Sequence, residues 1–176
     1  MLAPDPTLLE RAFAYYPAIF RYFRYRGADA DTANDLAAAV FERALSHMHL
    51  FDVRKARIQT WLFTIAHNLA INHWKYEVTH PIEALDSDMP VLDQSPLEET
   101  VVLAQEKGQV LLAVQSLDER SRQILALKFA AALTNRQIAG ITGLTESNVG
   151  VILHRSLIKL RSLLIVSNSL EERHDQ

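Results

Sequence analysis

An acidic stretch rich in proline divides this chain into two blocks, and it constrains the fold more than any other sequence feature. Residues 79–100 contain six carboxylates and no Lys or Arg. Three of the six prolines of the chain lie there, at Pro81, Pro90 and Pro96. The stretch has no helical periodicity, which is typical of an extended linker. The alternative is a long surface loop within one domain, but such loops are uncommon in compact units.

Both flanking blocks have the composition and periodicity of helices, so the predicted fold class is all-α, with two small domains joined by an acidic flexible linker. The predicted divisions are a domain at 5–78, the linker at 79–98, a second domain at 99–165 and a disordered tail at 166–176. In the first block, one helix is expected to run from Leu8 to a stop at Gly27. Asp29 and Asp31 are candidate N-caps of the next.

A third helix is expected from about Arg57 to Glu77, with apolar residues on two sides and a polar stripe between them. Its two apolar strips are Ile58, Trp61, Leu62, Ile65 and Leu69, and Phe63, Ala66, Ala70 and Trp74. The polar stripe contains Thr60, Thr64, His67, Asn68, Asn72 and Lys75. A helix buried on two sides belongs inside a helical bundle.

The second block is expected to contain helices near 97–116 and 119–131, followed by the stretch LTNRQIAGITGLTESNVGVILHRSLIKL at 133–160. Thr134 and Gln137 have the spacing of a capping box. Gly143 suits a tight turn, and Thr145 can cap the next helix. A short helix, a turn and a second helix form a helix-turn-helix, whose second helix enters the major groove of DNA.

That second helix divides into a core face and an outward face. Val149, Ile152, Leu153, Ser156 and Leu160 are expected to pack inward. Ser147 and Asn148 can bond to base edges, Val151 can touch a thymine methyl, and basic residues including Arg161 suit phosphates. The residues selected for duplex contact are Arg136, Thr145, Ser147, Asn148, Val151, His154, Arg155 and Lys159. Gly150 can let the backbone lie close to the duplex. The alternative is an ordinary helical hairpin with a solvated face.

Composition excludes several classes of protein. The chain of 176 residues has no cysteine, which excludes disulfides and thiolate metal sites. We find no secretion signal and no apolar run long enough for a membrane span, so a soluble cytoplasmic protein is expected. The seven histidines form no cluster with metal-ligand spacing, and no nucleophile motif or glycine-rich phosphate loop is present. We therefore expect no metal, no cofactor and no enzymatic activity.

Two segments in order, with the acidic linker between them, resemble the bacterial extracytoplasmic-function (ECF) sigma factors, which are promoter-specificity subunits of RNA polymerase. The first rests on DLAAAVFERAL and FDVRKARIQTWLFTIAHNLAINH, and the second on LDERSRQILALKFAAALTNRQIAGITGLTESNVGVILHRSLIKLR. The resemblance covers about residues 8–165. It implies that the second domain binds the −35 element as duplex, through the helix-turn-helix and beside the β flap of the polymerase.

The resemblance also implies that the first domain docks on the β′ clamp of core polymerase and melts the −10 element. The implied polymerase-binding residues are Asp35, Leu36, Ala39 and Glu42. The residues implied to hold the unpaired −10 strand are Arg54, Lys55, Arg57, His67, Asn68, Asn72, His73 and Lys75. Trp61 resembles a packing residue of the family. The resemblance also implies an anti-sigma factor as a further partner. The acidic linker resembles the family segment that threads the RNA exit path of the polymerase. The alternative is that its carboxylates serve only to keep the linker soluble.

The chain departs from the usual family pattern in three places. Ala38 and Ala39 stand where Gln-Glu is common, the first block ends in HWKYE without an arginine run, and the reader helix has fewer basic residues. Fewer phosphate contacts predict weaker, less salt-dependent DNA binding. Two other readings stay open. One is a free-standing helix-turn-helix regulator that binds a palindromic duplex, and the other is a helical protein-interaction adaptor with no role on DNA.

Overall fold

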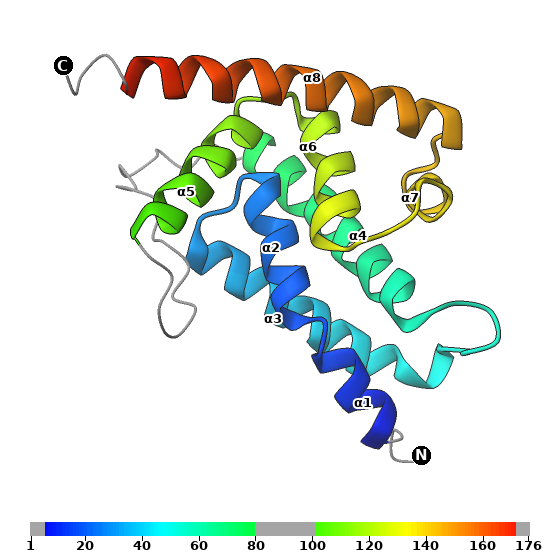
Figure 1. Ribbon diagram of the computed structural model, residues 1–176. Coiled ribbons are helices and arrows are strands. Elements are labelled where there is room, and N and C mark those ends of the chain that lie inside the picture. Colours follow the sequence, from blue (N-terminus) through cyan, green and yellow to red (C-terminus); the bar gives the residue numbers. More distant parts are fainter. Residues whose placement is uncertain (1–5, 80–100, 172–176) are drawn as a thin grey trace.

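The computed structural model describes residues 6–79 and 101–171, and every regular element within those ranges is a helix (Figure 1). The N-terminal unit, residues 6–79, contains α1 (Pro6–Phe13), α2 (Tyr16–Arg26), α3 (Ala30–His47), the 3₁₀ turn η1 (Met48–Leu50) and α4 (Ile58–Thr79). The C-terminal unit, residues 101–171, contains α5 (Val101–Gln115), α6 (Glu119–Leu125), the π-helical turn η2 (Ala126–Ala130), α7 (Asn135–Thr142) and α8 (Glu146–Glu171). The all-α fold predicted from the sequence is confirmed.

The start of the chain corrects the prediction of one continuous first helix. The chain forms two helices, α1 and α2, which are separated at Ala14 and Tyr15. Pro17 lies in the first turn of α2, where its missing N–H leaves no bond unmade. A helix continuing through Pro17 would lose a hydrogen bond and clash with the preceding turn, so the chain restarts there.

Other helix ends follow the predicted signals. Gly27 ends α2 in the left-handed region at φ 112°, which glycine adopts without steric cost. The side chain of Asp29 caps α3 by accepting a hydrogen bond from the Thr32 amide at 2.7 Å, whereas Asp31 lies in the first turn. Of the two candidate caps, Asp29 is therefore the one used.

Two predicted boundaries are corrected. Thr79 is the last residue of α4 and was placed in the linker; the remaining linker residues, 80–98, lie outside the described residues. The helix α8 continues to Glu171, so residues 166–171 are helical and were wrongly assigned to a disordered tail. Extending an existing helix costs much less than starting one, which is why α8 runs past the last core residue.

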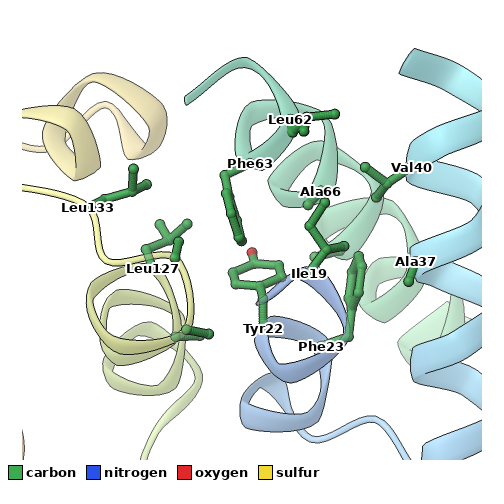
Figure 2. Close-up of a cluster of buried hydrophobic side chains, with 14 of the residues drawn as sticks. Ile19, Tyr22, Phe23, Ala37, Val40, Leu62, Phe63, Ala66, Leu127 and Leu133 are labelled. Atoms are coloured by element: carbon green, nitrogen blue, oxygen red, sulfur yellow. The ribbon is translucent and has the colours of Figure 1, made fainter. Parts of the chain in front are cut away.

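The core is shared between the two units (Figure 2). In the N-terminal unit, α3 packs against α2 and α4, and α2 also packs against α6 and η2 of the C-terminal unit. Figure 2 shows Leu127 and Leu133 facing Phe63 and Tyr22, and all four side chains are fully buried. A single hydrophobic cluster thus extends across both units. The sequence did not predict this packing, because a linker composition says nothing of what the joined units contact.

Candidate nucleic-acid interface

The helix-turn-helix is built by local hydrogen bonds that the sequence predicted. Thr134 and Gln137 form the capping box of α7: the Gln137 amide donates to Thr134 Oγ1, and the Thr134 amide donates to Gln137 Oε1. Gly143 ends α7 at φ 72°, in the left-handed region. Thr145 Oγ1 accepts a hydrogen bond from the Asn148 amide at 3.2 Å and so closes the first turn of α8. These bonds fix the start of α8 relative to α7.

The outward face of α8 is open to solvent over its first three turns. Val149 and Leu153 are buried and Ile152 is half-buried, which confirms the predicted core face. The residues selected for duplex contact are all exposed: Arg136, Thr145, Ser147, Asn148, Val151, His154, Arg155 and Lys159. We call these eight residues the reader face. Nothing in the described residues covers it, so a DNA duplex can approach it without a change in the protein.

A groove of about 270 Å³ lies between α6 and α8, beside the reader face. Arg155 and Lys159 line it from α8, and Arg120 lines it from α6. Asp118 also lines the groove, so three cations and one carboxylate face it, and the net positive charge attracts phosphate. Sequence reasoning missed Arg120, because it is 35 positions before Arg155 and only the packing of α6 on α8 brings the two together.

Gly150 of α8 lies beside Asn135 of α7. A methyl group added there would lie 3.7 Å from Nδ2 of Asn135, which is an ordinary contact distance. Space within the protein therefore does not require glycine at this position.

The loop before α4 holds basic side chains at the surface. Arg54, Lys55 and Arg57 are exposed. Asp52 shapes the loop: its carboxylate accepts hydrogen bonds from the Arg54 amide at 2.9 Å and from the Arg54 guanidinium at 3.1 Å. These bonds to Arg54 hold the pKa of Asp52 below its usual value. Arg54 is thus partly neutralised, whereas Lys55 and Arg57 keep their charge available for phosphate.

Behind this loop, the ring of Trp61 packs on Phe51, with 4.9 Å between ring centroids. Trp61 is half-buried in this contact. This geometry is that of a packing residue, as the family resemblance implied.

The polar stripe of α4 is divided into an open and a covered part. Asn68, Asn72 and Lys75 are exposed along the open part, and His73 is half-buried with its ring edge-on to Trp74. Thr60, Thr64 and His67 form the part that lies toward the C-terminal unit. Thr60 and Thr64 are half-buried, and His67 is 6% exposed. His67 was selected as a −10 residue, and it is the one member of that set that this structure does not leave accessible.

The ring of His67 contacts α6. Nε2 of Gln123 lies 2.7 Å from Nδ1 of His67. An amide nitrogen only donates, so Nδ1 must accept and carries no proton. Burial, and to a lesser extent the charge of Arg26, lower the pKa of His67 from 6.5 to about 4. His67 is therefore neutral at physiological pH.

Besides Gln123, two more glutamines join α4 to the C-terminal unit. Gln59 donates to the carbonyl oxygen of Ala131. Ala132, next in the chain, has φ 50°, a conformation unusual for a residue other than glycine. Gln137 donates through Nε2 to Thr60 Oγ1 at 3.0 Å, while its Oε1 serves the capping box of α7. Gln137, which completes the capping box of α7, thus also joins the helix-turn-helix to α4.

An ion pair between a buried arginine and an exposed glutamate joins α2 to α6. The guanidinium of Arg26, only 1% exposed, donates to Oε1 of Glu119 at 3.0 Å. It also lies over the ring of Trp74, 4.7 Å from the centroid, and contacts the hydroxyl of Tyr22 at 3.3 Å. Sequence reasoning did not find the pair with Glu119, because residues 26 and 119 are 93 positions apart in the chain and only the packing of the units brings them together.

The residues implied to dock on polymerase lie on α3. Asp35 and Glu42 are exposed, and Leu36 and Ala39 are half-buried. The opposite side of α3, including Ala37 and Val40, is buried against the N-terminal core. A patch with two carboxylates and a small apolar surface is thus accessible on the outside of the bundle.

Comparisons with known proteins identify the two units. The family model described as Sigma-70 region 2 matches residues 13–78, and the one described as Sigma-70, region 4 matches residues 107–160. These matches coincide with the N-terminal and C-terminal units. Together they cover more than half of the chain and occur in the order expected from the sequence.

Two curated relatives are RNA polymerase sigma factors. The chain is 30% identical over 155 residues to the ECF RNA polymerase sigma factor BldN of Streptomyces coelicolor; the match covers 85% of this chain and 57% of that protein. It is 29% identical over 168 residues to the RNA polymerase sigma factor YlaC of Bacillus subtilis, covering 90% of this chain and 92% of that protein.

Solved structures share the fold. The sigma factor RpoE of Bartonella quintana, in complex with the anti-sigma factor NepR, superimposes with a TM-score of 0.74 at 18% identity, over 89% of this chain and 96% of that one. CnrH, in complex with the cytosolic domain of CnrY, gives a TM-score of 0.65 at 18% identity, over 93% and 98% of the two chains.

The structure defines an all-helical protein of two units, the second of which presents an exposed helix-turn-helix. The family matches go further: the chain belongs to the sigma-70 family, as an ECF sigma factor with regions 2 and 4. It directs RNA polymerase to promoters, and it is a non-enzymatic subunit. Within the described ranges, no helix combines the length and the apolarity needed to cross a bilayer.

Proposed function

We propose that this sigma factor reads the two promoter elements with two separate surfaces. The reader face of α8 binds the −35 element as duplex, with Ser147 and Asn148 on base edges and Arg155 and Lys159 on phosphates. Arg120 extends this phosphate contact across the groove. The full exposure of the reader face is the single observation that carries the assignment.

The second surface is the loop before α4 together with the open part of the α4 stripe. Lys55 and Arg57 lie where phosphates of an unpaired strand can be neutralised, and Asn68 and Asn72 present amides that can bond to bases turned out of the stack. His73 and Lys75 continue the same surface. Trp61 supports it from behind and does not stack on a base.

The two units are proposed to contact different parts of the polymerase. Asp35, Leu36, Ala39 and Glu42 of α3 form the contact with the β′ clamp of bacterial core polymerase, and the C-terminal unit lies against the β flap. Such a subunit works in the cytoplasm, with the polymerase. The proposed path of the acidic linker through the RNA exit channel concerns residues 80–98, which lie outside the described residues.

An anti-sigma factor is a further proposed partner. Of the two solved structures that share this fold, one contains the anti-sigma factor NepR and the other contains the cytosolic domain of CnrY. Capture of bacterial proteins by the tagged chain tests this: recovery of polymerase together with a sequestering protein supports it, and repeated recovery of polymerase alone contradicts it.

Run-off transcription from a random-promoter library, with bacterial core polymerase and the purified chain, tests the proposal as a whole. Enrichment of paired −35 and −10 motifs is expected. The Ser147→Ala/Asn148→Ala variant should relax the −35 motif, and Asn68→Ala/Asn72→Ala should relax the −10 motif. Binding to a palindromic duplex without polymerase would favour a free-standing regulator. If both variants select the same promoter sequences as the unmodified chain, the result would favour an adaptor without a DNA role.

A further inference from the structure

We propose that the groove between α6 and α8 is a binding site for a small molecule that carries a terminal phosphate group. The ligand would compete with promoter duplex for Arg155 and Lys159, which line the groove and also belong to the reader face. Only this competition rests on the proposed function. The site itself rests on the residues of the groove.

The first support is a buried hydroxyl group. Ser156 lines the groove and is only 3% exposed. Its Oγ has no hydrogen-bond partner among the described residues. A buried polar group without a partner is rare in native proteins and calls for a bound molecule or a function. Because a serine hydroxyl turns about a single bond, it can donate to an oxygen atom bound in the groove.

The second support is the set of cations. Arg155 and Lys159 line the groove from α8, and Arg120 lines it from α6. In the described part of the chain, none of the three forms an ion pair. Asp118 also lines the groove, but its carboxylate already accepts hydrogen bonds from the amide of Ser121 at 3.0 Å and from its Oγ at 2.7 Å. The cations are thus available to an anion.

The net charge of the groove favours one kind of phosphate. Three positive charges and one negative charge leave +2. A phosphomonoester carries about −1.5 to −2 at pH 7, whereas each phosphate of the DNA backbone carries about −1. A monoester therefore matches the groove in charge. It also presents three terminal oxygen atoms, whereas a backbone phosphate is joined to a sugar on both sides.

The third support is the apolar side of the groove. Leu117 and Ile152 line it beside the charged residues. Its volume of about 270 Å³ is just below the range of roughly 300–1,000 Å³ that is typical of small-molecule pockets. A phosphate ion alone would leave the two apolar side chains uncovered. The expected ligand is therefore a phosphomonoester with a small apolar body.

Three probes separate the possible ligands in NMR titrations of the full chain labelled with ¹⁵N, at constant ionic strength. Phenyl phosphate joins a terminal phosphate to a small apolar ring. Inorganic phosphate tests the anion alone, and dimethyl phosphate tests a diester like that of the DNA backbone. The amide signals of Ser121 and Ile152 report binding in the groove, which both residues line.

Three variants test the residues. Ser156→Ala removes the buried hydroxyl, and Arg120→Gln removes one cation of the groove. Arg21→Gln removes an exposed cation of α2, outside the groove, and is the matched control. The affinity for phenyl phosphate should fall about tenfold in Arg120→Gln, because a charge-assisted hydrogen bond is lost, and about threefold or more in Ser156→Ala. It should not change in Arg21→Gln.

We expect phenyl phosphate to bind about tenfold more tightly than either of the other probes. Equal binding of dimethyl phosphate would assign the groove to backbone phosphates, and equal binding of inorganic phosphate would leave the apolar side without a role. Either result overturns the proposed ligand. Equal effects of Arg120→Gln and Arg21→Gln, or signal changes away from the groove, overturn the site.

The competition is measured with a fluorescent duplex that carries the −35 motif selected from the promoter library. Phenyl phosphate at ten times its dissociation constant should weaken duplex binding about tenfold, compared with sodium chloride at equal ionic strength. Unchanged duplex binding overturns the competition. The proposed function is judged separately: if Ser147→Ala/Asn148→Ala leaves the selected motif unchanged, the −35 assignment fails, while the titrations still decide the phosphate site.

Discussion

The reader face of α8 and the polar stripe of α4 are both polar helix surfaces proposed to contact DNA, yet the fold treats them differently. The reader face is exposed at all eight positions, whereas the stripe is open at Asn68, Asn72 and Lys75 and covered at His67. Duplex DNA is present before transcription starts, and an unpaired strand appears only after polymerase opens it. A surface for the first can stay exposed, while a surface for the second can be kept covered until it is needed.

Locking the units together should give the largest effect. Nε2 of Gln137 lies 3.0 Å from Oγ1 of Thr60, so Thr60→Cys/Gln137→Cys can be bridged by a short bis-maleimide, which spans the length that the shorter cysteine side chains leave open. Run-off transcription should fall about a hundredfold or more, because apparent affinity scales with the competent fraction. Binding of the cross-linked protein to double-stranded DNA should persist.

Each single cysteine variant, treated with the same reagent, is the control and should transcribe normally. Full transcription by the cross-linked protein would show that the stripe need not be uncovered.

Changing the two surfaces separately should sharpen the comparison. Ser147→Ala/Asn148→Ala should reduce discrimination for the −35 duplex by about 1–3 kcal/mol for each lost base contact and leave single-strand binding intact. Asn68→Ala/Asn72→Ala should do the reverse. Gel-shift titration with both kinds of DNA provides the measurement. Loss of both activities in either variant would mean that the surfaces are not independent.

Acid should weaken the contact between α4 and α6. In the packed units the pKa of His67 is lowered from 6.5 to about 4, and it should return toward 6.5 when the units separate. Protonation therefore favours separation: the contribution of His67 to the packing of the units is complete above pH 6.5 and is lost as the pH falls toward 4. The groups facing His67 are Gln123 of α6 and Arg26 of α2, whose charge is paired with Glu119. Hydrogen bonds from Ser121 hold the pKa of Asp118, the N-cap of α6, below its usual value.

The distance between fluorescent labels on the two units, measured at about pH 7.5 and about pH 5, should show the fraction of separated units rising by roughly an order of magnitude. The neutral variant His67→Gln should remove this dependence. A pH response of equal size in His67→Gln would assign it to another group.

The smallest effect is expected at Gly150. Gly150→Ala should stabilise the protein by up to about 1 kcal/mol, because alanine is the better helix former and its methyl group would make an ordinary contact with Asn135. Thermal melting tests this. A stabilised variant with weaker duplex binding would show that DNA approaches the backbone closely there. Destabilisation would contradict the account of the α7–α8 contact.

The sequence predicted local features well. The cap at Asp29, the stop at Gly27, the capping box at Thr134 and the turn at Gly143 depend on neighbours within four positions, so residue types suffice to find them. The break before α2 was missed although Pro17 signals it, because the apolar pattern continues across the break. The reader face was found since helical periodicity separates its positions from those of the core.

The contact between the units could not be predicted in this way. Gln59, Gln123 and Glu119 are ordinary surface residues by type, and the Arg26–Glu119 pair joins positions 93 apart in the chain. His67 was expected to be accessible because it lies in a polar stripe, and a stripe facing DNA has the same pattern as one facing another polar surface. Only the packing of α6 and α7 on α4 distinguishes them.

The most direct test of the account is the distance between two fluorescent labels, attached at Ser46→Cys on α3 and Ser162→Cys on α8, which are exposed positions of a chain without cysteine. It is measured in the free chain and after addition of bacterial core polymerase. The account predicts one narrow separation in the free chain and a changed separation on the polymerase, under conditions in which run-off transcription proceeds. A broad separation in the free chain would contradict the packing of α6 and α7 on α4, and an unchanged one on a transcribing polymerase would show that His67 need not be uncovered for transcription.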